Sequence, residues 1–266
     1  NEIYFVIKKI KEFFKYWNQI INKMKKFLND LIGITGYQVK KKKYLYDPNK
    51  NLIKSIKHFQ IKSIIDVGAN RGQFAQRVFK NNFDGNIISF EPLKEEHESL
   101  NKLSSKKENW QVAKRCALGN KNEVKTFYIS GNSESSSLLK ILQKHTDLRP
   151  ESKTIKTEKI NVERLDNFKK EISKLKKNLL LKIDTQGSEI DVLKGASKVI
   201  KDIKCLFIEV SLVSLYKNQK LWLDIIKYME KLNFNVWSID QLLRNKNTGQ
   251  TYQLDIFFYK NKWKLW

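Results

Sequence analysis

The sequence is poor in the residues that crosslink small secreted domains or hold structural metals. Its 266 residues include two cysteines, Cys116 and Cys205, both within apolar runs. They predict buried thiols in a reducing compartment and no disulfide framework. No zinc-type ligand spacing occurs, so the cysteines and histidines indicate no metal ligands. No apolar run approaches the roughly 18 residues that indicate a transmembrane helix.

Arginine is scarce beside lysine, although the formal charge is +24. Proteins that read nucleic acids favour arginine, whose guanidinium makes bidentate contacts with bases and phosphates. A lysine excess spread along the whole chain is more typical of a solvated surface with incidental affinity for anions. We therefore expect nucleic acid not to be the functional partner.

The remaining pattern predicts an α/β fold. Apolar runs alternate with helical patterns, which indicates a mainly parallel sheet. The expected strands cover residues 63–67, 86–90, 110–114, 179–184, 205–210, 234–239 and 255–259, with extra strands at 123–129 and 160–165. The polar segment 130–157 is either disordered or an active-site loop. We expect an N-terminal extension over residues 1–60 and a core domain over residues 61–266.

Residues 1–32 have the pattern of a basic amphipathic helix. Apolar residues from Ile3 to Leu31 recur at steps of three and four, and lysines occupy the other face. Three partners suit such an apolar face: the core domain, a second subunit in a homodimer, or an anionic membrane surface. We expect a cytoplasmic protein, with the inner membrane face as the place of any peripheral contact.

The most informative motif is the segment 66–72, Asp-Val-Gly-Ala-Asn-Arg-Gly, which joins a strand to a helix start. Its glycines are spaced G-x-x-x-G and lack the third glycine of a dinucleotide turn. S-adenosylmethionine (SAM) carries no phosphate, but it has an ammonium, a carboxylate and a ribose. Asp66 suits the ammonium, directly or through water, and the backbone N–H groups of the turn suit the carboxylate. Glu91, which ends the next strand, suits the ribose hydroxyls.

A second group of acids follows the strand 179–184. Ligands of open α/β sheets lie outside the carboxyl ends of the strands, which predicts that Asp184 faces Asp66 across a pocket. A hydroxyl acceptor needs a base, for which Asp184 is the first candidate, with Glu189 or Glu209 positioning the acceptor. Two alternatives stay open: the acids only stabilise the following helix, or a carboxylate pair holds a divalent ion.

Together these motifs resemble the FkbM-type SAM-dependent methyltransferases over residues 60–260. The matching motifs are residues 66–72, Phe90-Glu91-Pro92, Ala117-Leu118-Gly119, residues 135–138, Leu165-Asp166 and residues 182–189. The resemblance implies a Rossmann-like class I methyltransferase sheet of seven strands, mainly parallel, with an antiparallel last strand. It implies SAM contacts at Asp66, Gly68, Ala69, Asn70, Gly72 and Glu91, with Cys116 and Ala117 near the adenine. It also implies O-methylation of a hydroxyl on a sugar, a glycan or a related metabolite.

Three other functions compete with this interpretation. An RNA methyltransferase is suggested by the charge, but residues 184–187 lack the Pro-Pro-aromatic motif used on exocyclic base amines. A nicotinamide oxidoreductase needs the missing third glycine. A non-catalytic basic adaptor for membranes or nucleic acids, on a Rossmann-like scaffold, would not need the acids Asp66, Glu91 and Asp184.

Overall fold

The computed structural model describes residues 2–35, 48–245 and 247–260. The chain divides into two compact units, Asn1–Asp47 and Pro48–Trp266. The first unit contains α1 (Glu2–Gly33), the helix expected over residues 1–32. No helix among the described residues combines the length and the apolar character needed to cross a bilayer.

The second, larger unit alternates strands and helices. Its helices are α2 (Pro48–His58), α3 (Gln73–Lys80), α4 (Lys94–Ser104), α5 (Gln143–Leu148), α6 (Lys169–Ile172), α7 (Glu189–Gly195) and α8 (Trp222–Lys231). Its strands are β1 (Ser63–Val67), β2 (Asn86–Phe90), β3 (Trp110–Val112), β4 (Ala117–Leu118), β5 (Glu123–Ser130), β6 (Thr154–Glu163), β7 (Leu179–Ile183), β8 (Ile203–Ser211), β9 (Phe234–Arg244) and β10 (Thr251–Lys260). The sequence placed the boundary after residue 60, whereas α2 belongs to the large unit, since Leu52 and Ile56 are buried in its core.

Within the described residues, the main sheet has seven strands in the order β3-β2-β1-β7-β8-β10-β9. Strand β10 runs antiparallel to both β8 and β9, whereas β3, β2, β1, β7 and β8 are parallel. The predicted Rossmann-like α/β sheet with an antiparallel last strand is confirmed.

Helices cover both faces of the sheet because its central strands are apolar on both sides. All five residues of β1 and of β7 are buried, as expected for parallel strands between two helical layers. Neighbouring residues of β1 point to opposite faces. Ile64 packs in the cluster that includes α2, α3 and α4, and Ile65 packs in the cluster that includes α7 and α8.

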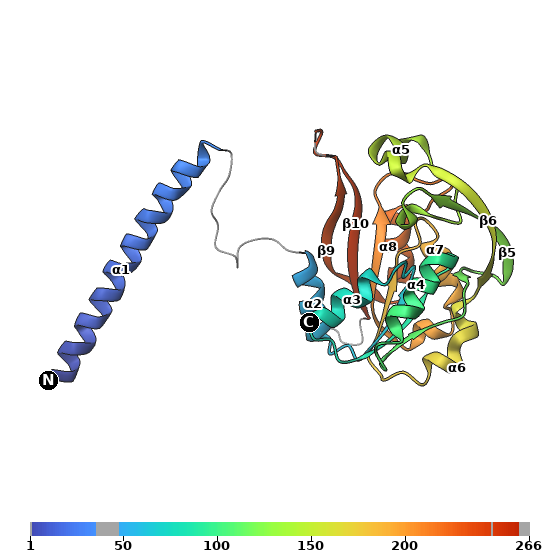
Figure 1. Cartoon of the computed structure of the whole chain (residues 1–266). Coiled ribbons are helices and arrows are strands. Elements are labelled where there is room, and N and C mark those ends of the chain that lie inside the picture. Colours follow the sequence, from blue (N-terminus) through green and yellow to red (C-terminus); the bar gives the residue numbers. More distant parts are fainter. Residues whose placement is uncertain (1, 36–47, 246, 261–266) are drawn as a thin grey trace. The chain divides into compact units, whose positions relative to one another are not determined.

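A smaller sheet, β4-β6-β5, lies at one side of the large unit. Figure 1 shows β5 and β6 as long curved strands on the side opposite β9 and β10. Both extra strands expected from the sequence are therefore present, at greater length. Between them, the polar segment 130–157 folds into η2 (Ser133–Ser135), α5, η3 (Pro150–Ser152) and the first residues of β6.

Strand register brings the candidate site together at one edge of the main sheet. Val67 lies beside Phe90 of β2 on one side and beside Ile183 of β7 on the other. Because the three strands are parallel, the residues that follow them emerge at the same edge. Their loops begin with Gly68, Glu91 and Asp184.

Candidate active site

The glycine turn after β1 depends on a close approach between two loops. Gly68 has φ +72°, and a Cβ atom there would lie 1.8 Å from the carbonyl oxygen of Asp184. Only glycine combines this left-handed conformation with so little space. The turn after β1 is thus packed directly on the backbone that follows β7.

Glu91 is held in place by the same turn. One carboxylate oxygen accepts a hydrogen bond from the backbone N–H of Asn70 (2.7 Å), and the other accepts one from the N–H of Leu93 (2.8 Å). Burial raises the pKa of Glu91 to about 7, although these two hydrogen bonds act in the opposite direction. The carboxyl group is fixed in position at the wall of a cavity.

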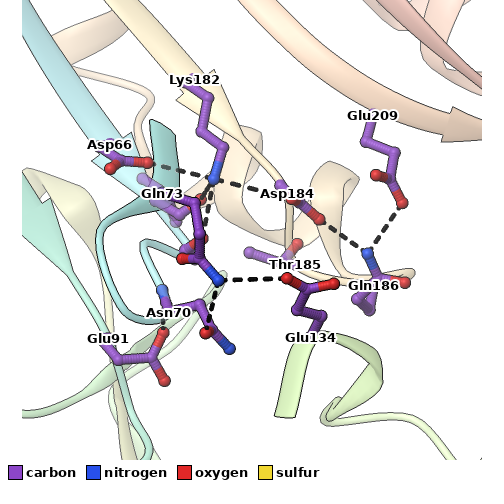
Figure 2. A network of polar contacts seen from close by, with 12 residues as sticks. Asp66, Asn70, Gln73, Glu91, Glu134, Lys182, Asp184, Thr185, Gln186 and Glu209 are labelled. Atoms are coloured by element: carbon purple, nitrogen blue, oxygen red, sulfur yellow. Dashed lines mark hydrogen bonds and ion pairs between the residues drawn. The ribbon is translucent and has the colours of Figure 1, made fainter. Parts of the chain in front are cut away.

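Lys182 of β7 is the central charge of the site, and the sequence analysis did not single it out. Its Nζ lies 3.1 Å from the Oδ1 of Asp66 and 3.8 Å from the Oδ2 of Asp184. It also donates hydrogen bonds to the carbonyls of Gly68 (2.7 Å) and Val67 (3.3 Å) (Figure 2). Burial opposes the charge of Lys182, but the two carboxylates outweigh it and raise its pKa.

This ion pair changes the interpretation of Asp66. The side chain is fully buried, and Ser89 and Lys182 are its polar neighbours. Asp66 is not one of the residues that line the cavity. Its carboxylate therefore neutralises Lys182 inside the sheet.

The amide of Gln186 joins two acids from neighbouring strands. Its Nε2 donates to the Oδ1 of Asp184 and to the Oε1 of Glu209, both at 2.8 Å. The Tyr216 hydroxyl donates to its Oε1 (2.9 Å), and the Ser137 hydroxyl donates to its backbone carbonyl (2.7 Å). The contact of the Tyr216 hydroxyl with Oε1 leaves the Nε2 end of the amide facing the two carboxylates, as Figure 2 shows for the two acids.

The surroundings of Glu209 favour its protonated form. Burial, and next the negative charges of Asp184 and Asp255, raise its pKa well above the usual range. Asp255 lies directly opposite Glu209 in the β8–β10 pairing. The amide of Gln253 donates a further hydrogen bond to the same Glu209 oxygen that Gln186 contacts. With one oxygen accepting these bonds, a proton on the other oxygen would make that oxygen a hydrogen-bond donor.

Glu189 accepts hydrogen bonds from the loop that leads into α7. Its Oε1 accepts hydrogen bonds from the backbone N–H of Gly187 (2.8 Å) and from the hydroxyl of Thr185 (3.1 Å). Burial raises its pKa to about 7. Glu189 is 4% exposed and lies outside the cavity wall, in the position that the helix-stabilising alternative describes.

A serine-rich segment, residues 133–137, crosses over the glycine turn. The Nδ2 of Asn70 donates to the Oγ of Ser133 (2.9 Å). The Nε2 of Gln73 donates to the Oε1 of Glu134 (3.1 Å), and Figure 2 shows these two side chains meeting. The segment that the sequence left open as a disordered or active-site loop therefore forms part of the cavity wall.

The cavity enclosed by these elements has a volume of about 270 Å³. Of the expected site residues, those in its wall are Gly68, Ala69, Asn70, Glu91, Cys116, Ala117, Asp184 and Glu209. Asp66, Gly72 and Glu189 are not in the wall. Burial raises the pKa of the Cys116 thiol to about 12, so this part of the wall is uncharged.

The α5 side of the cavity adds His145 and Arg149. Burial, and next the charge of Arg149, lower the pKa of His145 to about 4, so its imidazole is neutral at physiological pH. Across the residues that the structure describes, no group of three or more His, Cys, Asp or Glu side chains is arranged to hold a metal ion.

The fold is a Rossmann-like α/β domain with a cavity at the carboxyl ends of β1, β2 and β7, where ligands of open α/β sheets bind. Residues 66–236 match the profile of the methyltransferase FkbM domain. The chain belongs to this family, which confirms the membership expected from the sequence.

Individual relatives are more distant. "Methyltransferase 1" of Beauveria bassiana (strain ARSEF 2860) is 28% identical over 143 residues, which cover 50% of this chain and 57% of that protein. The structure of an uncharacterized protein of Listeria monocytogenes serotype 4b matches with a TM-score of 0.45 and 10% sequence identity, and the match covers 82% of this chain and 69% of that protein's chain. The structure of an rRNA methylase of Streptococcus thermophilus matches with a TM-score of 0.43 and 11% sequence identity, and the match covers 81% of this chain and 98% of that protein's chain.

Removing Lys182 is expected to destabilise the large unit, because Asp66 would stay buried without its counter-charge. Lys182→Met should lower the free energy of unfolding by about 3–5 kcal/mol, and Asp66→Asn/Lys182→Met should recover most of that loss. Urea denaturation measures both values. Lys62→Met, at an exposed ion pair of 4.0 Å with Asp84, is the matched control, with an expected change below about 1 kcal/mol. A double variant as unstable as Lys182→Met contradicts the pairing.

Glu189 is expected to make stability depend on pH. Its pKa is 4.5 in the unfolded chain and about 7 in the folded one, so its contribution is complete below 4.5 and is lost as pH rises through 7. The free energy of unfolding of the wild type, compared with Glu189→Gln, should therefore fall over this interval by on the order of 1–3 kcal/mol. Urea denaturation between about pH 4.5 and 7 measures the difference in free energy of unfolding between the two proteins. Glu95→Gln, at an exposed position, is the control. A difference that does not vary with pH contradicts the assignment.

Proposed function

We propose that the protein is a SAM-dependent O-methyltransferase whose acceptor is a hydroxyl of a sugar, a glycan or a related metabolite. The observation that carries the proposal is the distribution of acids around one cavity. A fixed Glu91 lies after β2, and Asp184 and Glu209 lie after β7 and within β8, with the glycine turn in the same wall. Membership of a methyltransferase family supports the reaction class.

Glu91 and the glycine turn suit the cofactor. The two backbone hydrogen bonds orient the Glu91 carboxyl group and leave it capacity to accept from ribose hydroxyls. Cys116, Ala117 and Phe127 give the wall an uncharged, largely apolar part that suits an adenine ring. We assign Asp66 to holding Lys182 and Gly72 to the turn, without cofactor contacts, because neither lines the cavity.

The three acids expected to be catalytic have separate roles in this proposal. SAM, when bound, supplies a methyl group on a positively charged sulfur. The side chain of Asp184 is 34% exposed, which leaves its carboxylate able to accept a proton from a hydroxyl. Protonated Glu209 can donate a hydrogen bond to the acceptor, and Glu189 positions the loop that carries Asp184.

RNA is the alternative acceptor, and the charge of +24 favours it. Binding of RNA through lysines would weaken steeply with salt because counterions are released. A small hydroxyl acceptor held by Asp184 and Glu209 would show little salt dependence. Methyl transfer to RNA that is lost at moderate salt, with no transfer to sugars or glycans, would favour the alternative.

Binding of S-adenosylhomocysteine tests the cofactor. Calorimetry should give a micromolar Kd for the wild type and no binding of NADH. In Glu91→Gln one of the two backbone donors faces an NH₂ group, so affinity should fall about tenfold or more. Glu95→Gln, on the exposed side of α4, is the matched control. Unchanged affinity in Glu91→Gln contradicts the ribose assignment, and binding of NADH alone contradicts the reaction class.

Substitution of Asp184 tests the base. With an acceptor found by screening sugars and glycans against methyl-labelled SAM, Asp184→Asn should lower kcat by about 10²–10⁴-fold. Its Kd for S-adenosylhomocysteine should stay close to that of the wild type. Glu209→Gln, which keeps a hydrogen-bonding group of similar shape, should lose less kcat. An Asp184→Asn protein with wild-type kcat would exclude Asp184 as the base.

A further inference from the structure

Helix α1 carries an exposed apolar stripe. Its members are 42–66% exposed: Ile10, Phe13, Phe14, Trp17, Met24, Phe27, Leu28 and Leu31. At 3.6 residues per turn they fall on one side of the helix. The rings of Phe13 and Trp17 stack with centroids 6.2 Å apart, so these two members of the stripe are neighbours on the helix surface.

The other side of α1 is cationic. The helix sequence contains seven lysines against three acidic residues. Lys11, Lys15 and Lys26 are exposed and fall opposite the stripe, and other lysines flank it. Four consecutive lysines, 40–43, follow in the sequence, outside the described residues.

Charge decides which partner fits this helix. A second copy of α1 would bring another excess of lysines, and the rest of this +24 chain is also strongly basic. Neither offers a net negative charge to the lysines. An anionic lipid surface offers both an apolar layer for the stripe and negative headgroups for the lysines.

We infer that α1 is an interfacial anchor that lies on an anionic lipid bilayer, with its apolar stripe in the acyl-chain boundary and its lysines among the headgroups. Lysines near such a surface are attracted by its negative potential, and the aromatic and aliphatic side chains add apolar burial. The helix thus lies on the surface without crossing it, in agreement with its low overall hydropathy.

Co-sedimentation of the full chain with vesicles tests this anchor. The probes are vesicles of pure phosphatidylcholine and vesicles in which one third of the lipid is phosphatidylglycerol. We expect binding to the anionic vesicles only, weakened at high salt. Phe13→Ser/Trp17→Ser/Phe27→Ser and, separately, Lys11→Gln/Lys15→Gln/Lys26→Gln should each weaken binding at least about tenfold.

Matched controls come from the large unit. Val124→Ser/Ile155→Ser removes apolar side chains that are 61% and 67% exposed, and Lys176→Gln/Lys177→Gln/Lys201→Gln removes exposed lysines. Both should bind like the wild type, and thermal unfolding of every variant should show an unchanged transition of the large unit.

Three results would overturn the inference. The first is no binding to anionic vesicles. The second is equal, salt-insensitive binding to both kinds of vesicle. The third is a lipid-free dimer that the stripe variant converts to a monomer, because it would assign the stripe to a second copy.

Discussion

The ion pair between Lys182 and Asp66 is the interaction on which the rest of the site depends. Lys182 extends from β7, yet it binds the Asp66 carboxylate and the carbonyls of Val67 and Gly68, where β1 ends. The side chain of Lys182 therefore links β1 and β7, the neighbouring strands at which the strand order of the sheet reverses. Ligand crevices of open α/β sheets form at that point. The close packing of Gly68 on the Asp184 backbone holds the loops after β1 and β7 together at the same place.

Burial then separates the acids around the junction into different roles. Asp184 is partly exposed and close to a cation. Glu91 and Glu189 are buried and Glu209 is half-buried, and all three have raised pKa values. Ionised carboxylates this close together repel one another, and the charges of Asp184 and Asp255 accordingly help to raise the pKa of Glu209. In the proposed reaction, Asp184 is the proton acceptor and Glu209 beside it donates a hydrogen bond.

The sequence predicted the sheet and the cavity edge because both follow from local patterns. Apolar runs located the strands, and glycine or acid at the end of a run located Gly68, Glu91 and Asp184. The partner of Asp66 could not be derived in this way, because it depends on which strand neighbours β1. A lysine within the apolar strand Leu179–Ile183 was the available signal, since a buried lysine requires a buried acid. The orientation of Gln186 depends on Tyr216, a contact between segments distant in sequence.

Asp66 and Glu91 differ in what they bind: Asp66 pairs with Lys182, and in the proposed function Glu91 binds the ribose of the cofactor. A crystal structure of the protein with S-adenosylhomocysteine would show both contacts. We expect ribose hydroxyls within hydrogen-bond distance of the Glu91 carboxyl group, and Lys182 still paired with Asp66. A ligand ammonium bound to the Asp66 carboxylate, with Lys182 displaced, would contradict this expectation.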